Sequence, residues 1–239
     1  SMKRHSRPTE AGPADQDMPR KVARSGIKMI DKHFPLLSRM EDPDALRDAH
    51  DVFNLVALVP VNLLNCSYLV LWSQGHPEEL NGFWALFWAT VVYFLVDLSW
   101  ILLIPASVKS PNFIIGHHIL TLLFILVPFH RPDKGWCMAA CLIVEINTWF
   151  LIARRYWKHY PIHSFFFYVT WIGIRLILYP YLIVAFYYVW MEDTERCGSY
   201  INPFMVAPVF QTVLLCLNLK WTRDLVISKL RAQGPAKGL

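Results

Sequence analysis

Long apolar runs separated by short polar segments dominate the chain. Beyond residue 50, six predominantly apolar stretches of 17 or more residues recur. An α-helix rises 1.5 Å per residue, so roughly 20 apolar residues cross a hydrocarbon core about 30 Å thick. We therefore predict six membrane-spanning helices, over Val52–Trp72, Phe83–Ile104, Phe113–Phe129, Trp136–Ala153, Phe165–Trp190 and Ile201–Leu219.

This pattern divides the chain into three parts. We expect a cytosolic N-terminal tail (residues 1–50), a transmembrane domain (51–222) and a cytosolic C-terminal tail (223–239). Apolar residues at approximate helical spacing in "RKVARSGIKMIDKHFPLLSRM" indicate an interfacial amphipathic helix within the N-terminal tail. The first residues, up to about 19, are polar and contain proline, so we predict disorder there.

Composition supports the membrane assignment. Hydrophobic residues make up 55% of the chain and charged residues 17%, against about 45–50% and 25% in an ordinary soluble domain. The net charge of +5 comes from basic residues that flank apolar segments, which favours membrane topology over nucleic-acid binding. Four of the five cysteines lie within apolar segments, so a disulfide framework is not expected, and we interpret Cys137 and Cys141 as small packing residues.

The loop charges predict the orientation of the chain. The loops "SQGHPEEL" and "MEDTERCGS" are acidic and "HRPDKG" is mixed, and these three share one side. The other side receives Lys109, the segment "ARRYWKHY" and the basic C-terminal residues. Positively charged loops stay in the cytosol, so both termini of this integral membrane protein are predicted to be cytosolic.

Few ionisable residues lie within the spans. They are Asp97, His117, His118, Glu145 and Arg175. Each costs about 2.5–3.5 kcal/mol at the centre of a helix by insertion scales, so each needs a compensating environment. Asp97, His117 and Glu145 stand about six to eight residues from the cytosolic ends of their spans, which is roughly 9–12 Å deep. This shared depth predicts an all-α, multi-pass transmembrane bundle of about six spans, enclosing a central cavity open to the cytosol.

An imidazole oriented by a carboxylate acts as a general base or a nucleophile. Thr121 shares the helix face of the two histidines, and Thr148 follows Glu145 by about one turn. The alternative is that these groups satisfy one another in a network that only fastens helices together. For Arg175 we favour a pair with one of the acids over reception of an anionic group.

The polar residues stand within recognisable motifs. These are "YFLVDL", "GHHILT", "EINTWFLIAR" and "RLILYPYL". In combination they resemble the TLC-domain family, membrane proteins related to ceramide synthase, over roughly residues 50 to 225. The chain is closer to the small TLC-domain-containing members than to ceramide synthases, because it lacks their paired aspartates after the histidines. It also departs from the small members, with Asn147 and Trp149 where serine and proline usually stand.

The resemblance implies a location in the endoplasmic reticulum and transfer of an acyl chain from acyl-CoA, as ceramide synthases do to a sphingoid base. By that resemblance His117 or His118 is the base or transient acyl acceptor and Asp97 orients it. The full set of predicted catalytic residues is His117, His118, Asp97 and Glu145; the predicted substrate-binding residues are Thr121, Asn147, Thr148, Arg175, Arg154, Arg155 and Lys158. No metal site is predicted.

The leading functional hypothesis is therefore an acyl-CoA-dependent lipid acyltransferase of the sphingolipid type. The alternative is a non-catalytic protein that binds, senses or transports lipid. Expected partners are membrane lipids and fatty acyl-CoA as co-substrate, with no tightly bound cofactor and no nucleic acid; a homodimer is left open. Metal-dependent oxidation is a third hypothesis, from His159 and His163 in "HYPIH", but Pro161 between them would disturb the helix that brings them together.

Overall fold

The structure is a computed structural model that describes residues 42–76 and 80–232. The predicted N-terminal disorder and interfacial helix lie outside these residues. The chain divides into two compact units, Ser1–Leu46 and Arg47–Leu239, and the account below concerns the second. Its described part is helical, without strands.

Each predicted span corresponds to one helical segment, and several of these segments extend beyond the predicted bounds. The α-helices are α3 (Pro43–Ser73), α4 (Leu80–Leu103), α5 (Pro111–Phe124), α6 (Leu126–His130), α7 (Trp136–Leu142), α8 (Val144–Tyr156), α9 (Pro161–Thr170), α10 (Tyr179–Cys197) and α11 (Val206–Ala232). Short 3₁₀ turns η1 (Pro105–Ser107), η2 (Pro132–Lys134) and η4 (Pro203–Met205) connect them. Within the described residues, six helical segments are long and apolar enough to cross a membrane, which confirms the predicted all-α, six-span fold.

The fifth span is not a regular α-helix. A π-helix, η3 (Trp171–Leu178), joins α9 to α10 and contains Arg175. Pro180 follows at the start of α10, where its missing N–H removes a helical hydrogen bond. π-Helical segments are rare and often stand at functional sites. The irregular segment therefore coincides with the one arginine predicted inside this span.

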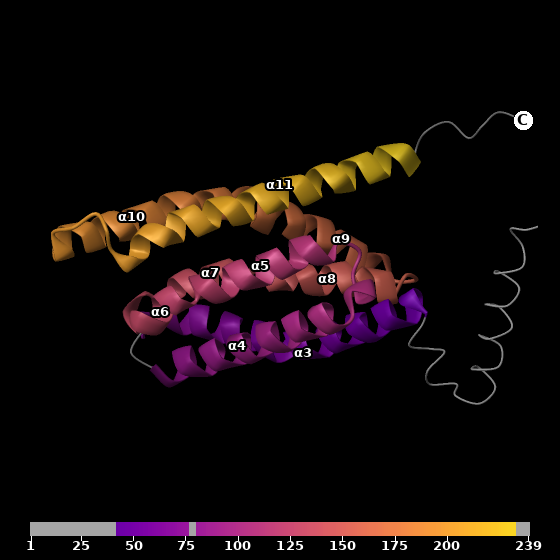
Figure 1. Cartoon of the computed structure of the whole chain (residues 1–239), viewed down its shortest axis with the longest axis horizontal. Coiled ribbons are helices and arrows are strands. Elements are labelled where there is room, and N and C mark those ends of the chain that lie inside the picture. The colour runs from indigo at the N-terminus through magenta and orange to yellow at the C-terminus, as the bar shows by residue number, and fades with distance from the viewer. Residues whose placement is uncertain (1–41, 77–79, 233–239) are drawn as a thin grey trace, which may run out of the picture. The chain divides into compact units, whose positions relative to one another are not determined.

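Neighbouring spans pack against each other in antiparallel pairs (Figure 1). Helix α4 packs on α5, α8 on α9, and α10 on α11, while α11 also contacts α5 and η3. Because each span reverses the chain direction, the loop before α5, the loop before α9 and the end of α11 gather at one end of the bundle. We call this the basic end, since it carries Lys109, Arg154, Arg155 and Lys158.

The opposite half of the bundle is packed with aromatic side chains. Phe124 and Phe186 lie 5.8 Å apart between ring centroids, and Tyr68 and Phe83 lie 6.0 Å apart. Gly135 lies so close to the Phe83 ring that an added Cβ would overlap it, which explains glycine at this position. Lipid tails are as apolar as these side chains, so close packing rather than exclusion of water holds this half together.

Ion pairs close the loop between α6 and α7 at that end. Arg131 donates from Nη2 to Asp133 at 2.8 Å and from Nη1 to the buried Asp193 on α10 at 2.7 Å. Hydrogen bonds to these two carboxylates raise the pKa of Arg131. Lys134 donates to Glu192 at 2.8 Å, so two side chains tie this loop to α10.

Candidate functional site

Asp97 lies at the centre of a buried hydrogen-bond network. Its Oδ2 lies 2.6 Å from Nε2 of His118 on α5, and its Oδ1 lies 2.6 Å from Nε2 of His50 on α3. Asn54 adds a third contact, donating from Nδ2 to Oδ1 at 3.2 Å. Asp97 itself is 3% exposed. One carboxylate on α4 therefore joins three helices, which makes it the organising residue of this half of the bundle.

Both ring nitrogens of His118 face oxygen atoms. Nδ1 lies 2.8 Å from the carbonyl oxygen of Ile114, which can only accept a hydrogen bond, so Nδ1 carries a proton. Nε2 faces the Asp97 carboxylate, so a second proton lies in that contact, on Nε2 or shared with Asp97. His118 is consequently fixed in position, and neither nitrogen is free to take a proton from another molecule.

His50 was not predicted from the sequence, because it stands among charged residues before the first predicted span. In the structure α3 begins at Pro43, and the buried face of that helix carries His50 and then Asn54 one turn later. Tyr93 on α4 extends the network by donating to Asn54 Oδ1 at 2.7 Å. The available signal was the polar pair at i and i+4 in register with the apolar residues Leu58 and Val61.

His117 has a different environment from its neighbour. Its Nδ1 is buried without a hydrogen-bond partner in the described part of the chain. Its ring lies between aromatic groups, 6.4 Å from Phe94 and 6.0 Å from Trp221 on α11, and perpendicular to the His118 ring. The next turn is closed by Thr121, whose hydroxyl donates to the His117 carbonyl at 2.9 Å. Of the two adjacent histidines, His117 is the one with a nitrogen available for chemistry.

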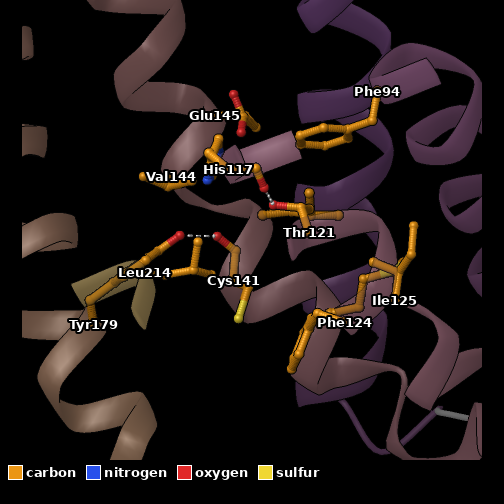
Figure 2. A pocket seen from close by; sticks show the side chains of 12 residues that line it. Phe94, His117, Thr121, Phe124, Ile125, Cys141, Val144, Glu145, Tyr179 and Leu214 are labelled. Carbon is orange, nitrogen blue, oxygen red and sulfur yellow. Dashed lines mark hydrogen bonds between the residues drawn. The ribbon is translucent and has the colours of Figure 1, made fainter. Parts of the chain in front are cut away.

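His117 borders a pocket lined by side chains from α4, α5, α7, α8, α10 and α11 (Figure 2). Thr121 and Glu145 line it together with apolar groups that include Phe94, Leu214 and Val144. Its volume is about 10 Å³, close to the minimum that a single water molecule needs. A central cavity open to the cytosol, as predicted from the sequence, is not seen in the part of the chain that the structure describes; Phe94, Phe124 and Leu214 are among the side chains that line this small pocket.

Glu145 approaches this pocket from α8, and Figure 2 shows its carboxylate above the His117 ring. The Thr148 side chain lies beside the same carboxyl group. Arg175 donates to the Thr148 hydroxyl at 3.4 Å, so Thr148 stands between the acid and the guanidinium group. Glu145 lies within electrostatic range of Arg175 and His118. Because Glu145 is only 4% exposed, little water screens these interactions.

Arg175 binds neutral oxygen atoms in place of the direct pair with an acid that the sequence favoured. Nε donates to Asn147 Oδ1 at 2.7 Å, and Nη1 donates to Asn218 Oδ1 at 2.5 Å. The guanidinium carbon lies 4.9 Å from the Trp171 ring centroid and 5.6 Å from that of Trp221. Asn218, on α11, is a second residue that the sequence analysis did not single out.

Asn147 was predicted to bind substrate, and its amide is already engaged. Nδ2 donates to the Phe167 carbonyl at 3.0 Å and to the Thr170 hydroxyl at 2.9 Å, while Oδ1 accepts from Arg175. Every polar atom of this fully buried side chain thus joins α8 to α9 and η3. Substrate contact by Asn147 stays a prediction, and the observed contacts are those of a residue that positions Arg175.

The basic residues of "ARRYWKHY" also have partners. Arg155 donates from Nη2 to Asp51 on α3 at 2.7 Å. Arg154 lies over the Phe167 ring, with 3.8 Å between its guanidinium carbon and the ring centroid. Lys158 is exposed in the loop before α9. Of these three predicted substrate-binding residues, Lys158 is the one without a hydrogen bond, ion pair or ring contact to another described residue.

His159 and His163 do not form a shared ligand pair. Pro161 begins α9, so His159 lies in the preceding loop and His163 in the first turn, where its ring stacks on Trp157 at 5.3 Å. Residues 42–76 and 80–232 contain no group of three or more His, Cys, Asp or Glu arranged to hold a metal ion. The Cys141 thiol donates a hydrogen bond to Gln211 Oε1 at 3.2 Å.

We call His50, Asp97, His117, His118, Glu145 and Arg175 the polar layer. It draws on α3, α4, α5, α8 and η3, and all its members lie in the half of the bundle nearer the basic end. Comparison with known proteins matches residues 52–227 to the family model described as TLC domain. No curated protein and no solved structure matches the chain. Since the matched region covers the whole membrane part from α3 to α11, this chain belongs to the TLC-domain family, a lipid-related family of membrane proteins.

Proposed function

We propose that this protein is a membrane enzyme that transfers a fatty acyl group from acyl-CoA to a membrane lipid, with His117 as the proton acceptor. The observation that carries the proposal is the buried Nδ1 of His117, which has no hydrogen-bond partner among the described residues and borders a pocket that Glu145 also lines. A buried imidazole nitrogen without a partner costs free energy, and in a polar pocket such a group is a candidate for catalysis. Membership of a lipid-related family supports the choice of substrate class.

The two adjacent histidines have different roles in this proposal: His118 is a positioning residue and His117 accepts the proton. His118, held by Asp97 and the Ile114 carbonyl, fixes the backbone turn that orients His117. His117 accepts the proton of the acceptor hydroxyl or amine as that group attacks the thioester carbonyl carbon. The new carbon–oxygen or carbon–nitrogen bond forms, the carbon–sulfur bond breaks, and the proton passes from His117 to the departing CoA thiolate. Glu145 stabilises the imidazolium while the proton rests on it.

Substrate entry requires the helices to separate. The pocket holds about 10 Å³, so an acyl chain enters only if α11, which contributes Leu214 and Trp221 next to His117, moves away from α5. The CoA moiety stays at the basic end, where the exposed Lys158 offers a charge to its phosphates. In this proposal the basic end and both termini face the cytosol, and the membrane is that of the endoplasmic reticulum.

The test uses purified protein in lipid nanodiscs with isotope-labelled acyl-CoA and a membrane lipid extract. A new labelled lipid is expected with the native chain and with His130→Ala, since His130 is exposed and lies in the half opposite the polar layer. The double substitution of His117 and His118 by alanine should abolish this product while the protein still elutes as a folded, lipid-loaded species. Undiminished turnover in the double variant would reject a catalytic role for the pair.

A second candidate function is lipid binding or sensing without chemistry. The hydrogen bonds of the polar layer favour it, since Asp97, His118 and Arg175 are already engaged by protein partners and three of the polar groups therefore have a structural role. It predicts a co-purified lipid whose headgroup contacts the polar layer and whose mass stays unchanged after long incubation with acyl-CoA. Mass spectrometry of the extracted lipids before and after incubation separates the two functions.

A further inference from the structure

A second hollow lies at the basic end, away from His117. It is an open groove of about 430 Å³ between the loop that precedes α5 and the last turns of α11. The residues that line it are Lys109, Arg223, Asp224, Ile227, Ser228 and Arg231. His117 stands six positions after Pro111, the first residue of α5, so the groove begins roughly 9 Å along the helix axis from the polar layer.

Three cations converge on this groove. Arg223 and Arg231 are two turns apart on one face of α11, and Lys109 faces them from the neighbouring loop. None of the three has a hydrogen bond or ion pair within the described residues, and the one acid, Asp224, is paired with Lys220 at 2.8 Å. Orientation in the membrane accounts for basic residues at this end, but it does not require three unpaired cations to line one concave surface.

Exposed apolar side chains stand on the helices at this end of the bundle. On α11, Val226 is 49% exposed and Leu230 is 62% exposed, and on α4, just before the loop, Leu103 is 82% exposed. Helix α11 has 27 residues and is about 40 Å long, which exceeds a hydrocarbon core of about 30 Å. Because its last turn carries the basic residues Lys229 and Arg231, we infer that this end extends to the level of the lipid headgroups, where a ligand with a charged head and apolar tails meets both kinds of surface.

We propose that this groove binds the headgroup of an anionic membrane phospholipid whose terminal phosphate is a monoester, as in phosphatidic acid. A phosphate monoester carries a charge of about −1.5 to −2 near neutral pH, which suits a site with three cations and one neutralised acid. The Ser228 hydroxyl adds a hydrogen-bond donor to the phosphate oxygens. Basic clusters next to the cytosolic end of a membrane helix bind anionic lipids in this way. The site is separate from the proposed acyl transfer and does not depend on it.

The test measures lipid binding by native mass spectrometry of the purified full chain in detergent, titrated with phosphatidic acid, phosphatidylglycerol or phosphatidylcholine of matched acyl chains. Phosphatidic acid should bind tightest, and Lys109→Ala and Arg223→Ala should each weaken it by about fivefold. Lys229→Ala is the matched control: it removes the same charge from the same helix end but does not line the groove, so it should leave the affinity within about twofold.

Two results would overturn the proposal. If phosphatidylglycerol binds as tightly as phosphatidic acid and Lys229→Ala weakens both as much as Arg223→Ala does, the attraction is a general surface charge effect. If free CoA displaces phosphatidic acid, and its own binding falls about fivefold in Lys109→Ala and Arg223→Ala, the groove receives the phosphates of the soluble co-substrate and not a lipid headgroup. Circular dichroism of each variant confirms that the helices are retained, so that a loss of binding is not a loss of fold.

Discussion

The two halves of the bundle are held together by different interactions. In the half nearer the basic end, Asp97 bonds His50 and His118 from two other helices, and Arg175 bonds Asn147 and Asn218. In the opposite half, aromatic rings fill the interior and the ion pairs lie at its rim. Polar groups in a membrane find no water to replace a lost partner, so each contact in the polar layer is specific, whereas the aromatic half responds to volume. This contrast predicts where substitutions act and how strongly.

Removal of the Asp97 carboxylate should have the largest effect on stability. Asp97→Ala leaves His50 and His118 buried without their common partner, and breaking such a buried pair costs about 3–5 kcal/mol. The free energy of unfolding, measured by SDS titration in mixed micelles, checks this value. Ser99→Ala on the same helix is the control, because Ser99 is exposed and bonds only within its own helix. A loss of under about 1 kcal/mol in Asp97→Ala would show that the network is not what holds this half together.

The guanidinium group of Arg175 ranks next. Arg175→Lys keeps the charge but cannot donate to Asn147 and Asn218 together, so about 2 kcal/mol of stability should be lost. The same substitution at Arg196, whose side chain is 58% exposed, should cost less than about 1 kcal/mol. Equal losses of stability at the two positions would mean that a lysine ammonium group can replace the guanidinium group in the polar layer. The contacts of Arg175 would then not be specific.

A change of volume tests the aromatic half. Gly135→Ala places a Cβ against the Phe83 ring and 2.7 Å from the Tyr68 hydroxyl oxygen, which should destabilise the protein by about 1–3 kcal/mol. Gly116→Ala in α5 is the matched control, because nothing lies within 4 Å of its added Cβ; greater helix propensity should leave it neutral or more stable by up to about 1 kcal/mol. Identical thermal midpoints for the two variants would contradict close packing around Gly135.

The smallest effect on stability is expected at the exposed ion pair between Lys134 and Glu192. Lys134 pairs with Glu192, whose side chain is 67% exposed, and exposed pairs contribute about 0–1 kcal/mol. Lys134→Ala should therefore shift the thermal midpoint only slightly, and 0.5 M salt should reduce even that shift by screening. Salt screens an exposed pair because the Debye length falls from about 10 Å at 0.1 M salt to about 3 Å at 1 M. If Lys134→Ala lost as much stability as Asp97→Ala, the exposed ion pairs and the buried polar layer would not differ in strength as described here.

The sequence predicts the six spans well because continuous apolar length is a direct requirement of the membrane. Helix ends are less predictable. Apolar length locates the membrane core but not the helix start, so α3 begins at Pro43 among charged residues and brings His50 into the interior. The π-helix around Arg175 has no marker in the apolar pattern, apart from Pro180 after it.

The candidate site is predictable in part for a related reason. Depth along a helix follows from counting residues, which is how Asp97, His117 and Glu145 could be placed at one level. The direction in which a side chain points around its helix axis, and the partner it meets, depend on the neighbouring helices. The sequence therefore did not predict Asn218 on α11 or the other partners of Arg175. The interior volume depends on how side chains such as Phe94 and Leu214 pack, which no pattern of residues fixes; the predicted open cavity is a pocket of about 10 Å³.

The most direct test separates the adjacent histidines. His117→Ala and His118→Ala are compared in one preparation for labelled lipid product and for the free energy of unfolding. His117→Ala should lose product while its stability falls by clearly less than that of His118→Ala, because its Nδ1 makes no hydrogen bond and only the packing of its ring is lost. His118→Ala should lose about 3 kcal/mol, because Asp97 is left without that partner. Full product formation by His117→Ala, or equal stability losses in the two variants, would contradict the division of roles proposed here.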